Sequence, residues 1–359
     1  MDIIDEAIEL LRSLIGTPSF SKDEANTAQI LTTWFEMRGV AVERIGNNIV
    51  AWHHSKSSQA PYILLNSHHD TVRPGQGWTM DPFTAIEVDG RLYGLGSNDA
   101  GAALVTMMAT FMRLRQRDDL PCSIMFAATA EEEISGANGM ALLTREYFTR
   151  EDVGLPDLAI IGEPTQMNVA VAEKGLIVLD CVAHGRTGHA ARGEGVNAIY
   201  AALSDINWFR SYEFERHSDT LGSVHMEVTQ IEAGTQHNVI PDRCAFVVDV
   251  RVTDAYANEE VLDIIRQHVS CDAIPRSLRL QPSAMPKDHP FLDTCRGLGL
   301  RTYGSPTMSD QSLLPDNVPS CKIGPGDSAR SHTPDEFIHI EEVRSGIDLM
   351  AALLEGYLQ

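Results

Sequence analysis

The 359-residue sequence has no run of about 18 apolar residues, the minimum for a membrane-spanning helix. Residues 1–15 predict an amphipathic acidic helix and lack the basic start and uniformly apolar core of a signal peptide. Basic residues are scarce, because 28 Lys and Arg stand against 50 Asp and Glu, for a formal net charge of −22. This charge disfavours nucleic acid and anionic membranes as partners. We therefore expect a cytoplasmic protein that binds neither.

Several common catalytic signatures are also missing. The sequence has no G-x-S-x-G, the usual sign of an α/β-hydrolase serine nucleophile. It has no H-E-x-x-H helix, no P-loop and no G-x-G-x-x-G fingerprint. The six cysteines show no Cys-x-x-Cys spacing, and several of them lie in apolar segments. They are Cys122, Cys181, Cys244, Cys271, Cys295 and Cys321. Buried free thiols in a reducing compartment are the simplest interpretation.

The sequence does contain five potential metal ligands spread along most of its length: His68, Asp99, Glu133, Glu163 and His332. Four of them follow apolar segments that predict strands, at residues 62–66, 122–128, 158–162 and 321–326. Asp99 lies in a Gly-rich turn that opens an apolar helix. In open α/β sheets, ligands gather beyond the carboxyl ends of the strands. Two imidazoles and three carboxylates converging there suit two divalent ions such as zinc.

Each of these residues has an ordinary structural explanation when it is taken alone. A single His beside a strand is usually a satisfied structural histidine. An Asp or Glu after a strand is usually a helix cap that accepts hydrogen bonds from first-turn amides. The joint occurrence of all five at predicted strand ends favours a metal centre, and it predicts a metal-dependent hydrolase.

The predicted elements divide the chain into a catalytic domain, residues 1–174 and 282–359, and an insertion at 175–281. Strand and helix patterns alternate in the outer segments, which predicts an α/β fold with a mixed sheet. Within the insertion the order is β-α-β-β-α-β, the ferredoxin-like plan of a four-stranded antiparallel sheet with two helices. We expect its elements at residues 176–183, 198–209, 223–232, 243–253, 258–269 and 277–280.

Two helices of the outer domain have clear local signals. Ser21 and Glu24 have the spacing of a capping box, which predicts a helix start just before the apolar positions of residues 28–35. Residues 102–114 keep helical spacing with several methionines, which we interpret as core and not as a binding surface.

The sequence resembles the metallopeptidase-like amidohydrolases that include acetylornithine deacetylase, succinyl-diaminopimelate desuccinylase, aminoacylase and carboxypeptidase G2. The resemblance covers essentially the whole chain and rests on the stretches LLNSHHDTVRP, WTMDPF, GRLYGLGSNDAGAAL, TAEEEISGANG, IIGEPT, GRTGHAARGEGVNAI, HNVIPD and GPGDSARSHTPDEF. One departure is that Gly101 and Ala102 stand where many relatives have Lys-Gly. The resemblance implies a zinc-peptidase-like catalytic domain with an inserted dimerisation or lid domain.

The resemblance also implies how two metal ions, zinc or alternatively cobalt, would be held. His68 and Glu163 would bind one ion, Glu133 and His332 the other, and Asp99 would bridge them. Asp70 lies on the same side of an extended segment as His68, so we expect it to orient that imidazole, although a solvated turn residue is the alternative. His69 should point away from the ions.

The three consecutive carboxylates Glu131, Glu132 and Glu133 cannot be told apart by sequence pattern alone. A charge run is usually solvated, which is our expectation for Glu131. The resemblance implies that Glu133 binds metal and that Glu132 is the general base. Such a base takes a proton from the attacking water and returns it to the leaving amine.

Three further residues of interest lie in the insertion. The resemblance implies that His189 reaches the active site of a partner subunit in a homodimer and stabilises the oxyanion there. The alternative is a surface histidine after a Gly turn. The resemblance also implies that Asn238 and Arg251 bind the substrate carboxylate, a task that suits a guanidinium group.

The expected substrate is an N-acyl amino acid, and the resemblance favours N-acetylornithine, with succinyl-ornithine, succinyl-diaminopimelate and acetyllysine as alternatives. The stretch GPGDSARSHTPDEF is more similar to acetylornithine and acetyllysine deacetylases than to succinyl-diaminopimelate enzymes. Nothing physical in the sequence separates acetyl from succinyl groups or ornithine from citrulline or lysine. A di- or tripeptidase and a catalytically silent metal-binding protein are the remaining alternatives.

Overall fold

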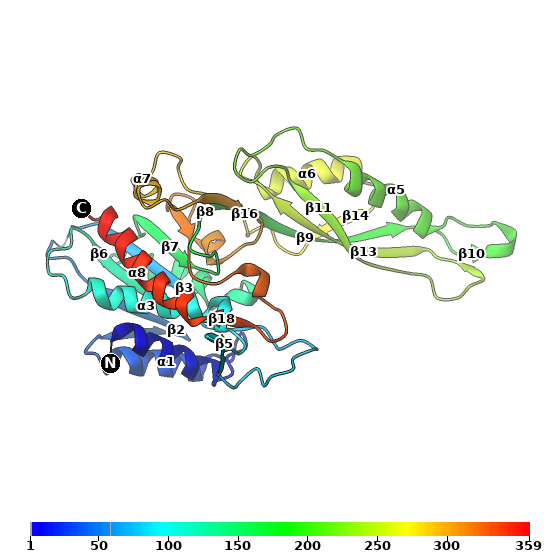
Figure 1. The fold of residues 1–359 in the computed structure, drawn as a ribbon. Coiled ribbons are helices and arrows are strands. Elements are labelled where there is room, and N and C mark those ends of the chain that lie inside the picture. Colours follow the sequence, from blue (N-terminus) through cyan, green and yellow to red (C-terminus); the bar gives the residue numbers. More distant parts are fainter. Residues whose placement is uncertain (1, 58) are drawn as a thin grey trace. The chain divides into compact units, whose positions relative to one another are not determined.

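The computed structural model describes residues 2–57 and 59–359 (Figure 1). The chain forms two compact units. The first ends at Val171 and includes Ala284–Tyr303 and Ser309–Gln359, and the second consists of Ala172–Ser283 and Gly304–Met308. The short segment Gly304–Met308 was not anticipated from the sequence, which placed the whole second domain between residues 175 and 281.

The first unit is built on a nine-stranded mixed sheet, which confirms the expected α/β class. Its order is β1 (Val42–Ile45), β2 (Asn48–His53), β6 (Ser123–Thr129), β3 (Tyr62–His68), β7 (Leu158–Gly162), β17 (Ser320–Lys322), β8 (Val169–Glu173) and β15 (Ser283–Ala284), with β16 (Thr302–Ser305) paired to β8. The central strands β6, β3, β7 and β17 run parallel, whereas β1, β2 and β8 pair antiparallel to their neighbours.

Strands β3, β6 and β7 are buried along their whole length, because both faces of the sheet are covered. Leu65 and Phe126 belong to the core on one face, whereas Leu64 and Met125 belong to the core on the other. This alternation is the period of two that a strand imposes on its side chains.

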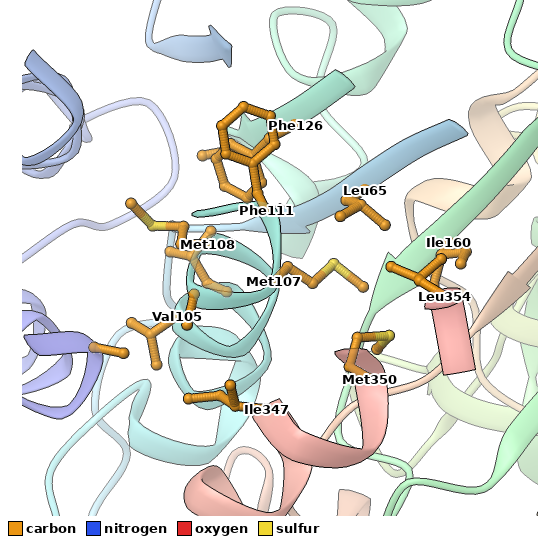
Figure 2. Packing of buried hydrophobic residues seen from close by; sticks show 14 of the residues in the cluster. Leu65, Val105, Met107, Met108, Phe111, Phe126, Ile160, Ile347, Met350 and Leu354 are labelled. Carbon is orange, nitrogen blue, oxygen red and sulfur yellow. The ribbon is translucent and has the colours of Figure 1, made fainter. Parts of the chain in front are cut away.

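Helices α1 (Ile3–Ile15), α2 (Ala25–Glu36), α3 (Ala102–Leu114), α7 (Pro290–Gly297) and α8 (Ile340–Tyr357) contribute to the larger of these cores. Figure 2 shows Met107 and Met108 of α3 packed among residues of the sheet and of α8. Both methionines are buried, so the methionine-rich stripe is core, as expected. All six cysteines are buried and free.

A smaller antiparallel sheet consists of β18 (Phe337–His339), β5 (Arg91–Tyr93) and β4 (Ile86–Val88). Strands β4 and β5 directly precede the Asp99 loop in the sequence, whereas β18 comes from near the C-terminus. Short helical turns and α4 (Met140–Leu142) follow β6. In the described part of the chain, no helix combines the length and the apolar character needed to cross a membrane.

The second unit has the expected ferredoxin-like arrangement. Its sheet has the order β11 (His225–Ala233), β13 (Arg243–Val252), β9 (Gly175–His184) and β14 (Asp272–Pro275), with every pair antiparallel. Helices α5 (Ala198–Ser211) and α6 (Asn258–His268) pack on it, and a two-stranded excursion pairs β10 (Gly188–His189) with β12 (Val239–Ile240).

The last strand of this unit was predicted wrongly. It lies at Asp272–Pro275 and not at residues 277–280. In the predicted segment, the carbonyls of Leu278 and Leu280 accept hydrogen bonds from the Asn258 side chain, 3.0 and 2.8 Å away. These carbonyls therefore hold the start of α6, a tertiary contact that alternating apolar residues do not reveal.

The predicted capping box is also wrong. Helix α2 begins at Ala25, and the Ser21 hydroxyl donates to Asp70 Oδ2 at 2.7 Å. Glu24 is buried and accepts from the backbone of Lys22 and the side chain of Asn47. The two side chains that would have capped the helix therefore form long-range hydrogen bonds instead, Ser21 with Asp70 and Glu24 with Asn47.

Candidate metal centre

The structure brings all five predicted ligands to one edge of the large sheet. His68 is the last residue of β3, and Glu163 directly follows β7. Glu133 lies in the turn after β6, and His332 lies in the loop that follows β17. Because these parallel strands end at the same edge, their side chains meet there. Asp99 joins them from the loop before α3.

Asp99 lies between the two histidines, with one carboxylate oxygen toward each. Its Oδ1 is 3.3 Å from His68 Nε2, and its Oδ2 is 3.6 Å from His332 Nε2. Glu133 Oε2 is 2.9 Å from His332 Nε2, and Glu163 Oε1 is 3.9 Å from His68 Nε2. A carboxylate that presents one oxygen to each imidazole has the arrangement that a bridging ligand requires.

Two groups of three side chains have potential ligand atoms within 4.8 Å of one another. One is His68, Asp99 and Glu133, and the other is His68, Glu132 and Glu163. His68 is common to both groups, and the expected base Glu132 lies as close to the cluster as the ligands do.

The residues present fit a divalent cation. His68 Nε2 is buried and has no hydrogen-bond partner among the residues that the structure describes. It faces the carboxylates of Asp99, Glu132 and Glu163 at 3.3 to 3.9 Å. Its other ring nitrogen contacts the backbone carbonyl of Asp70 at 3.0 Å, so Nε2 is the atom left to bind a metal. A buried nitrogen of this kind among carboxylates calls for a cation.

Crowding of carboxylates in a buried site changes their protonation. Burial, together with repulsion from Asp99, raises the pKa of Glu163 to about 8 against the attraction of His68. Burial and neighbouring carboxylates likewise raise the pKa of Glu132 well above its usual value. The hydrogen bond to Glu133 raises the pKa of His332 to about 9. The raised pKa values mean that these side chains tend to hold protons without a metal, and a bound cation would displace those protons.

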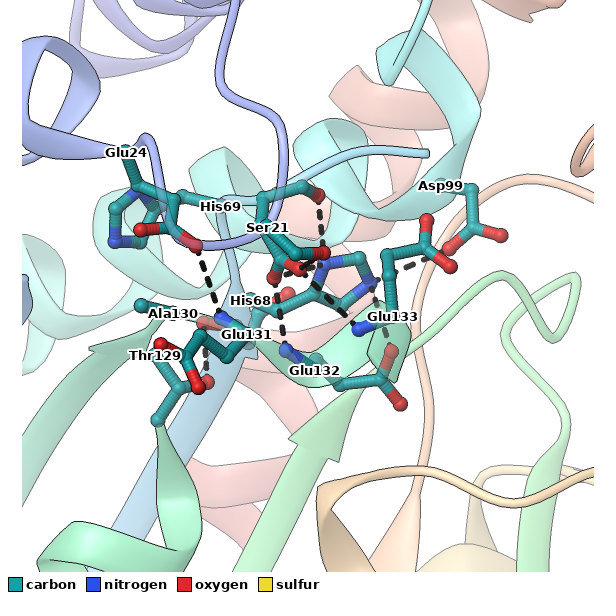
Figure 3. A network of polar contacts seen from close by, with 12 residues as sticks. Ser21, Glu24, His68, His69, Asp99, Thr129, Ala130, Glu131, Glu132 and Glu133 are labelled. Atoms are coloured by element: carbon teal, nitrogen blue, oxygen red, sulfur yellow. Dashed lines mark hydrogen bonds and ion pairs between the residues drawn. The ribbon is translucent and has the colours of Figure 1, made fainter. Parts of the chain in front are cut away.

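Asp70 is a buried carboxylate that contacts three of these residues. Figure 3 shows the three, His68, Glu132 and Glu133. Its Oδ1 accepts the backbone amide of Glu132 at 3.0 Å and lies 3.4 Å from His68 Nδ1. Its Oδ2 accepts the backbone amide of Glu133 at 3.2 Å. The alternative of a solvated turn residue is therefore wrong, and the position of Asp70 suits the orienting role expected from the sequence.

The expectation of a solvated Glu131 is wrong. Its side chain is buried, and its two oxygens accept from the side-chain and backbone amides of Asn138 at 2.7 and 3.2 Å. Glu131 has a left-handed backbone with φ 56°, which places this side chain away from the two carboxylates that follow. His69 points away from the ligands as expected, because its ring contacts Thr27 and the carbonyl of Asn47.

Sequence reasoning missed two buried carboxylates beside the cluster. Glu336 accepts hydrogen bonds from the backbone amides of Gly96, Asn98 and Asp99 at 3.1, 2.8 and 2.9 Å, and so it holds the loop that carries Asp99. Its place four residues after His332 was the only signal. Asp310 accepts from Thr129 Oγ1 at 2.5 Å and contributes to the raised pKa of Glu132. No predicted strand end marks Asp310.

The three predicted residues of the insertion lie in the second unit. His189 is exposed in β10, and its Nδ1 accepts from the amide of Ala191 at 3.2 Å. The Asn238 carbonyl accepts from the amide of Ala190 at 3.0 Å, so the structure brings His189 and Asn238 close together. Arg251 lies on β13 and binds both oxygens of Asp249 at 2.7 and 3.0 Å. Their roles toward the metal centre stay predictions.

Known proteins are similar to this chain over nearly its full length. The chain is 28% identical over 382 residues to acetylornithine deacetylase of Proteus mirabilis, covering 98% of this chain and 96% of that protein. It is 29% identical over 384 residues to acetylornithine deacetylase of Shigella sonnei, covering 98% and 97%.

Solved structures have the same fold. The aminopeptidase PepT from Bacillus cereus matches with a TM-score of 0.77 at 20% identity, covering 99% of each chain. A dinuclear metal binding peptidase of the M20 family from Bacillus subtilis matches with a TM-score of 0.74 at 19% identity, covering 99% of this chain and 98% of that one. The model of peptidase family M20/M25/M40 matches residues 64–356. The chain therefore belongs to peptidase family M20/M25/M40 and is a hydrolase of amide bonds.

Proposed function

We propose that this protein is a dinuclear metal amidohydrolase that removes the acyl group from an N-acyl amino acid, with N-acetylornithine as its substrate. The observation that carries the proposal is Asp99, whose two oxygens face His68 and His332 separately beside the carboxylate of Glu132. The similarity to acetylornithine deacetylases, at 28% and 29% identity, supports the choice of substrate.

Two Zn²⁺ ions are the proposed cofactors, with Co²⁺ as the alternative, because both nitrogen and carboxylate ligands are present. His68 and Glu163 would hold one ion, Glu133 and His332 the other, and Asp99 would bind both. When bound, such ions would polarise the amide carbonyl and acidify a water molecule.

Glu132 is the proposed general base. Its Oε2 is 3.9 Å from His68 Nε2, so it lies at the edge of the ligand cluster. Its raised pKa, caused first by burial, suits a group that must accept a proton and then release it. Glu132 would take a proton from water as the water oxygen bonds to the acyl carbon. It would pass that proton to the amine nitrogen as the carbon–nitrogen bond breaks.

The second unit would complete the site in a homodimer. His189 would stabilise the oxyanion in the site of the partner subunit, and Asn238 and Arg251 would bind the substrate carboxylate. Two features of this unit support a dimer interface. Tyr200 and Leu203 on α5 are 72% and 47% exposed, and Ile231 on the edge strand β11 is 58% exposed. An edge strand with exposed apolar side chains can pair with its copy about a two-fold axis.

The test is turnover of a panel by protein loaded with Zn²⁺. The panel contains N-acetylornithine, N-acetylcitrulline, N-acetyllysine, N-succinylornithine, N-succinyl-diaminopimelate, dipeptides and tripeptides. We expect the highest kcat/KM with N-acetylornithine, loss of turnover on chelation, and recovery with Zn²⁺ or Co²⁺. A preference for a succinyl substrate would correct the acyl group, and a preference for peptides would identify a peptidase. Absence of all turnover in fully loaded protein would indicate a silent metal-binding protein.

A further inference from the structure

The segment of residues 19–27, here called the N-terminal strap, lies against the metal centre. Its Ser19 carbonyl accepts from the amide of Thr71 at 2.8 Å, and Phe20 forms a parallel bridge with Thr71. Ser21 donates to Asp70. Glu24 accepts from the backbone amide of Glu131 at 3.3 Å, as Figure 3 shows. The strap therefore contacts the segment after β3, which carries Asp70, and the turn after β6, which carries Glu132 and Glu133. The family match, however, begins only at residue 64.

Within the strap, Ser21 contacts Asp70, the carboxylate that binds His68 and the amides of Glu132 and Glu133. In the described part of the chain, four groups contact the buried Asp70 carboxylate by a hydrogen bond or an ion pair: the hydroxyl of Ser21, the backbone amides of Glu132 and Glu133, and the imidazole of His68. The Ser21 hydroxyl is the nearest of them, at 2.7 Å from Oδ2. Among the described residues, the other hydrogen bond to that oxygen comes from the amide of Glu133, at 3.2 Å. Without Ser21, rotation of the carboxylate would be less restricted.

We propose that Ser21 is a positioning residue that acts through Asp70 on His68, Glu132 and Glu133. Its hydroxyl holds the carboxylate in the orientation that keeps the His68 ring aimed at the ligand cluster. The same orientation anchors the two amides of the turn after β6. The role of Ser21 toward the metal ligands rests on the geometry, and its effect on turnover rests on the proposed function.

The competing explanation is that Ser21 only helps to attach the strap. Thr27 provides the matched control, because its hydroxyl also forms side-chain contacts from the strap, with His69 Nδ1 at 2.9 Å and with the Glu24 carbonyl at 3.0 Å. The His69 ring points toward Asn47 and away from the ligand cluster. Thr27 is buried, so Thr27→Val should cost at least as much stability as Ser21→Ala.

The experiment compares Ser21→Ala, Ser21→Thr and Thr27→Val in full-length protein loaded with Zn²⁺ or Co²⁺. We measure kcat, KM, bound metal, the visible absorption of the Co²⁺ form and the melting temperature. Loss of a group that orients metal ligands typically lowers metal affinity or activity about 10- to 100-fold. We expect Ser21→Ala to show such a loss in kcat with little change in KM, together with an altered Co²⁺ spectrum. Ser21→Thr should recover most of both.

Thr27→Val should lower the melting temperature and keep the wild-type kcat and Co²⁺ spectrum. The proposal is overturned if Ser21→Ala keeps both wild-type values, or if kcat in both variants falls in step with stability. If Ser21→Ala does not fold, Ser21→Cys, which keeps a weak donor of similar size, carries the same comparison. If the wild type hydrolyses none of the panel, the proposed function fails. The Co²⁺ spectra and metal affinities then still decide whether Ser21 positions the ligands.

Discussion

Glu132 and Glu133 are adjacent in the chain but have different neighbours. Glu133 Oε2 lies 2.9 Å from His332 Nε2, which pairs it with a proposed ligand. Glu132 Oε2 lies 3.9 Å from His68 Nε2, and the charges of Glu163 and Asp310 contribute to raising the pKa of Glu132. Both backbone amides donate to the same carboxylate, that of Asp70. The two side chains can therefore have separate roles although one anchor holds the turn.

Glu132→Gln should separate catalysis from metal binding. The amide keeps the shape of the side chain but cannot accept a proton, so kcat should fall by about 10²- to 10⁴-fold. Metal content, measured by elemental analysis, should stay close to that of the wild type. Glu133→Gln is the matched control and should lose metal. The opposite pattern, with metal lost in Glu132→Gln and activity kept in Glu133→Gln, would show that the roles are reversed.

Metal binding should release protons near pH 7. The pKa of Glu163 is raised to about 8, so most of this carboxyl is protonated at about pH 7 in metal-free protein. The pKa of His332 is raised to about 9, so it too must lose a proton to bind a metal. The sign follows: affinity for Zn²⁺ should fall as the pH falls below these values.

Titration calorimetry of Zn²⁺ binding in buffers with different ionisation enthalpies would count the released protons. Glu163→Gln should release fewer protons than the wild type. Binding that releases no protons and does not change with pH would contradict the assignment of these two residues as ligands.

At the scale of the elements, the loop before α3 depends on a contact that is distant in sequence. Glu336 accepts three backbone amides of residues 96–99, and burial and the charge of Asp99 raise its pKa to about 8. This carboxylate lies just before β18, which pairs with β5 ahead of the same loop. The small antiparallel sheet therefore helps to hold the loop that positions Asp99.

Glu336→Ala should destabilise this loop and weaken metal binding together. The substitution leaves three amides without their acceptor, and each buried unsatisfied group costs about 1–3 kcal/mol. The free energy of unfolding, measured by denaturant titration, should fall by at least the cost of one such amide. The Zn²⁺ affinity should also fall, because the loop no longer holds Asp99 in place. The exposed Glu341 on α8 supplies the control, since Glu341→Ala should change neither quantity. A loss of stability with unchanged Zn²⁺ affinity would contradict the link to Asp99.

At the scale of the whole molecule, the two units divide the predicted site residues between them. The five proposed ligands, Asp70 and Glu132 belong to the first unit, whereas His189, Asn238 and Arg251 belong to the second. The exposed side chains of α5 and β11 lie in the second unit. The same unit would thus provide both the dimer contact and the residues that act on the substrate.

Mixing two inactive variants tests this division. His189→Ala and Glu132→Gln should each be inactive alone, yet a mixed dimer would contain one site with both residues intact if His189 serves the partner subunit. Random exchange makes about half of the dimers mixed, so about a quarter of wild-type turnover should return. Demonstrated subunit exchange without recovery would mean that His189 acts in its own chain or has no role.

Much of the fold and of the proposed ligand set could be predicted from sequence, because both follow local patterns. The choice of Glu133 over Glu132 as a ligand came from the family resemblance. Apolar segments define β3, β6 and β7, and parallel strands end at the same edge. Ligands placed at such ends must therefore approach one another, and His68, Glu133 and Glu163 do. The order of strands and helices likewise predicted the ferredoxin-like sheet of the second unit.

Only the tertiary structure decided which polar side chains turn inward and what they contact. Ser21 and Glu24 had the local spacing of a helix cap, but they form hydrogen bonds with Asp70 and with the amide of Glu131 instead. Glu131 had the appearance of a solvated charge, but its oxygens bind Asn138 in the interior. A buried carboxylate must find donors, and those donors come from segments brought together by the fold. Local spacing carries no information about such partners.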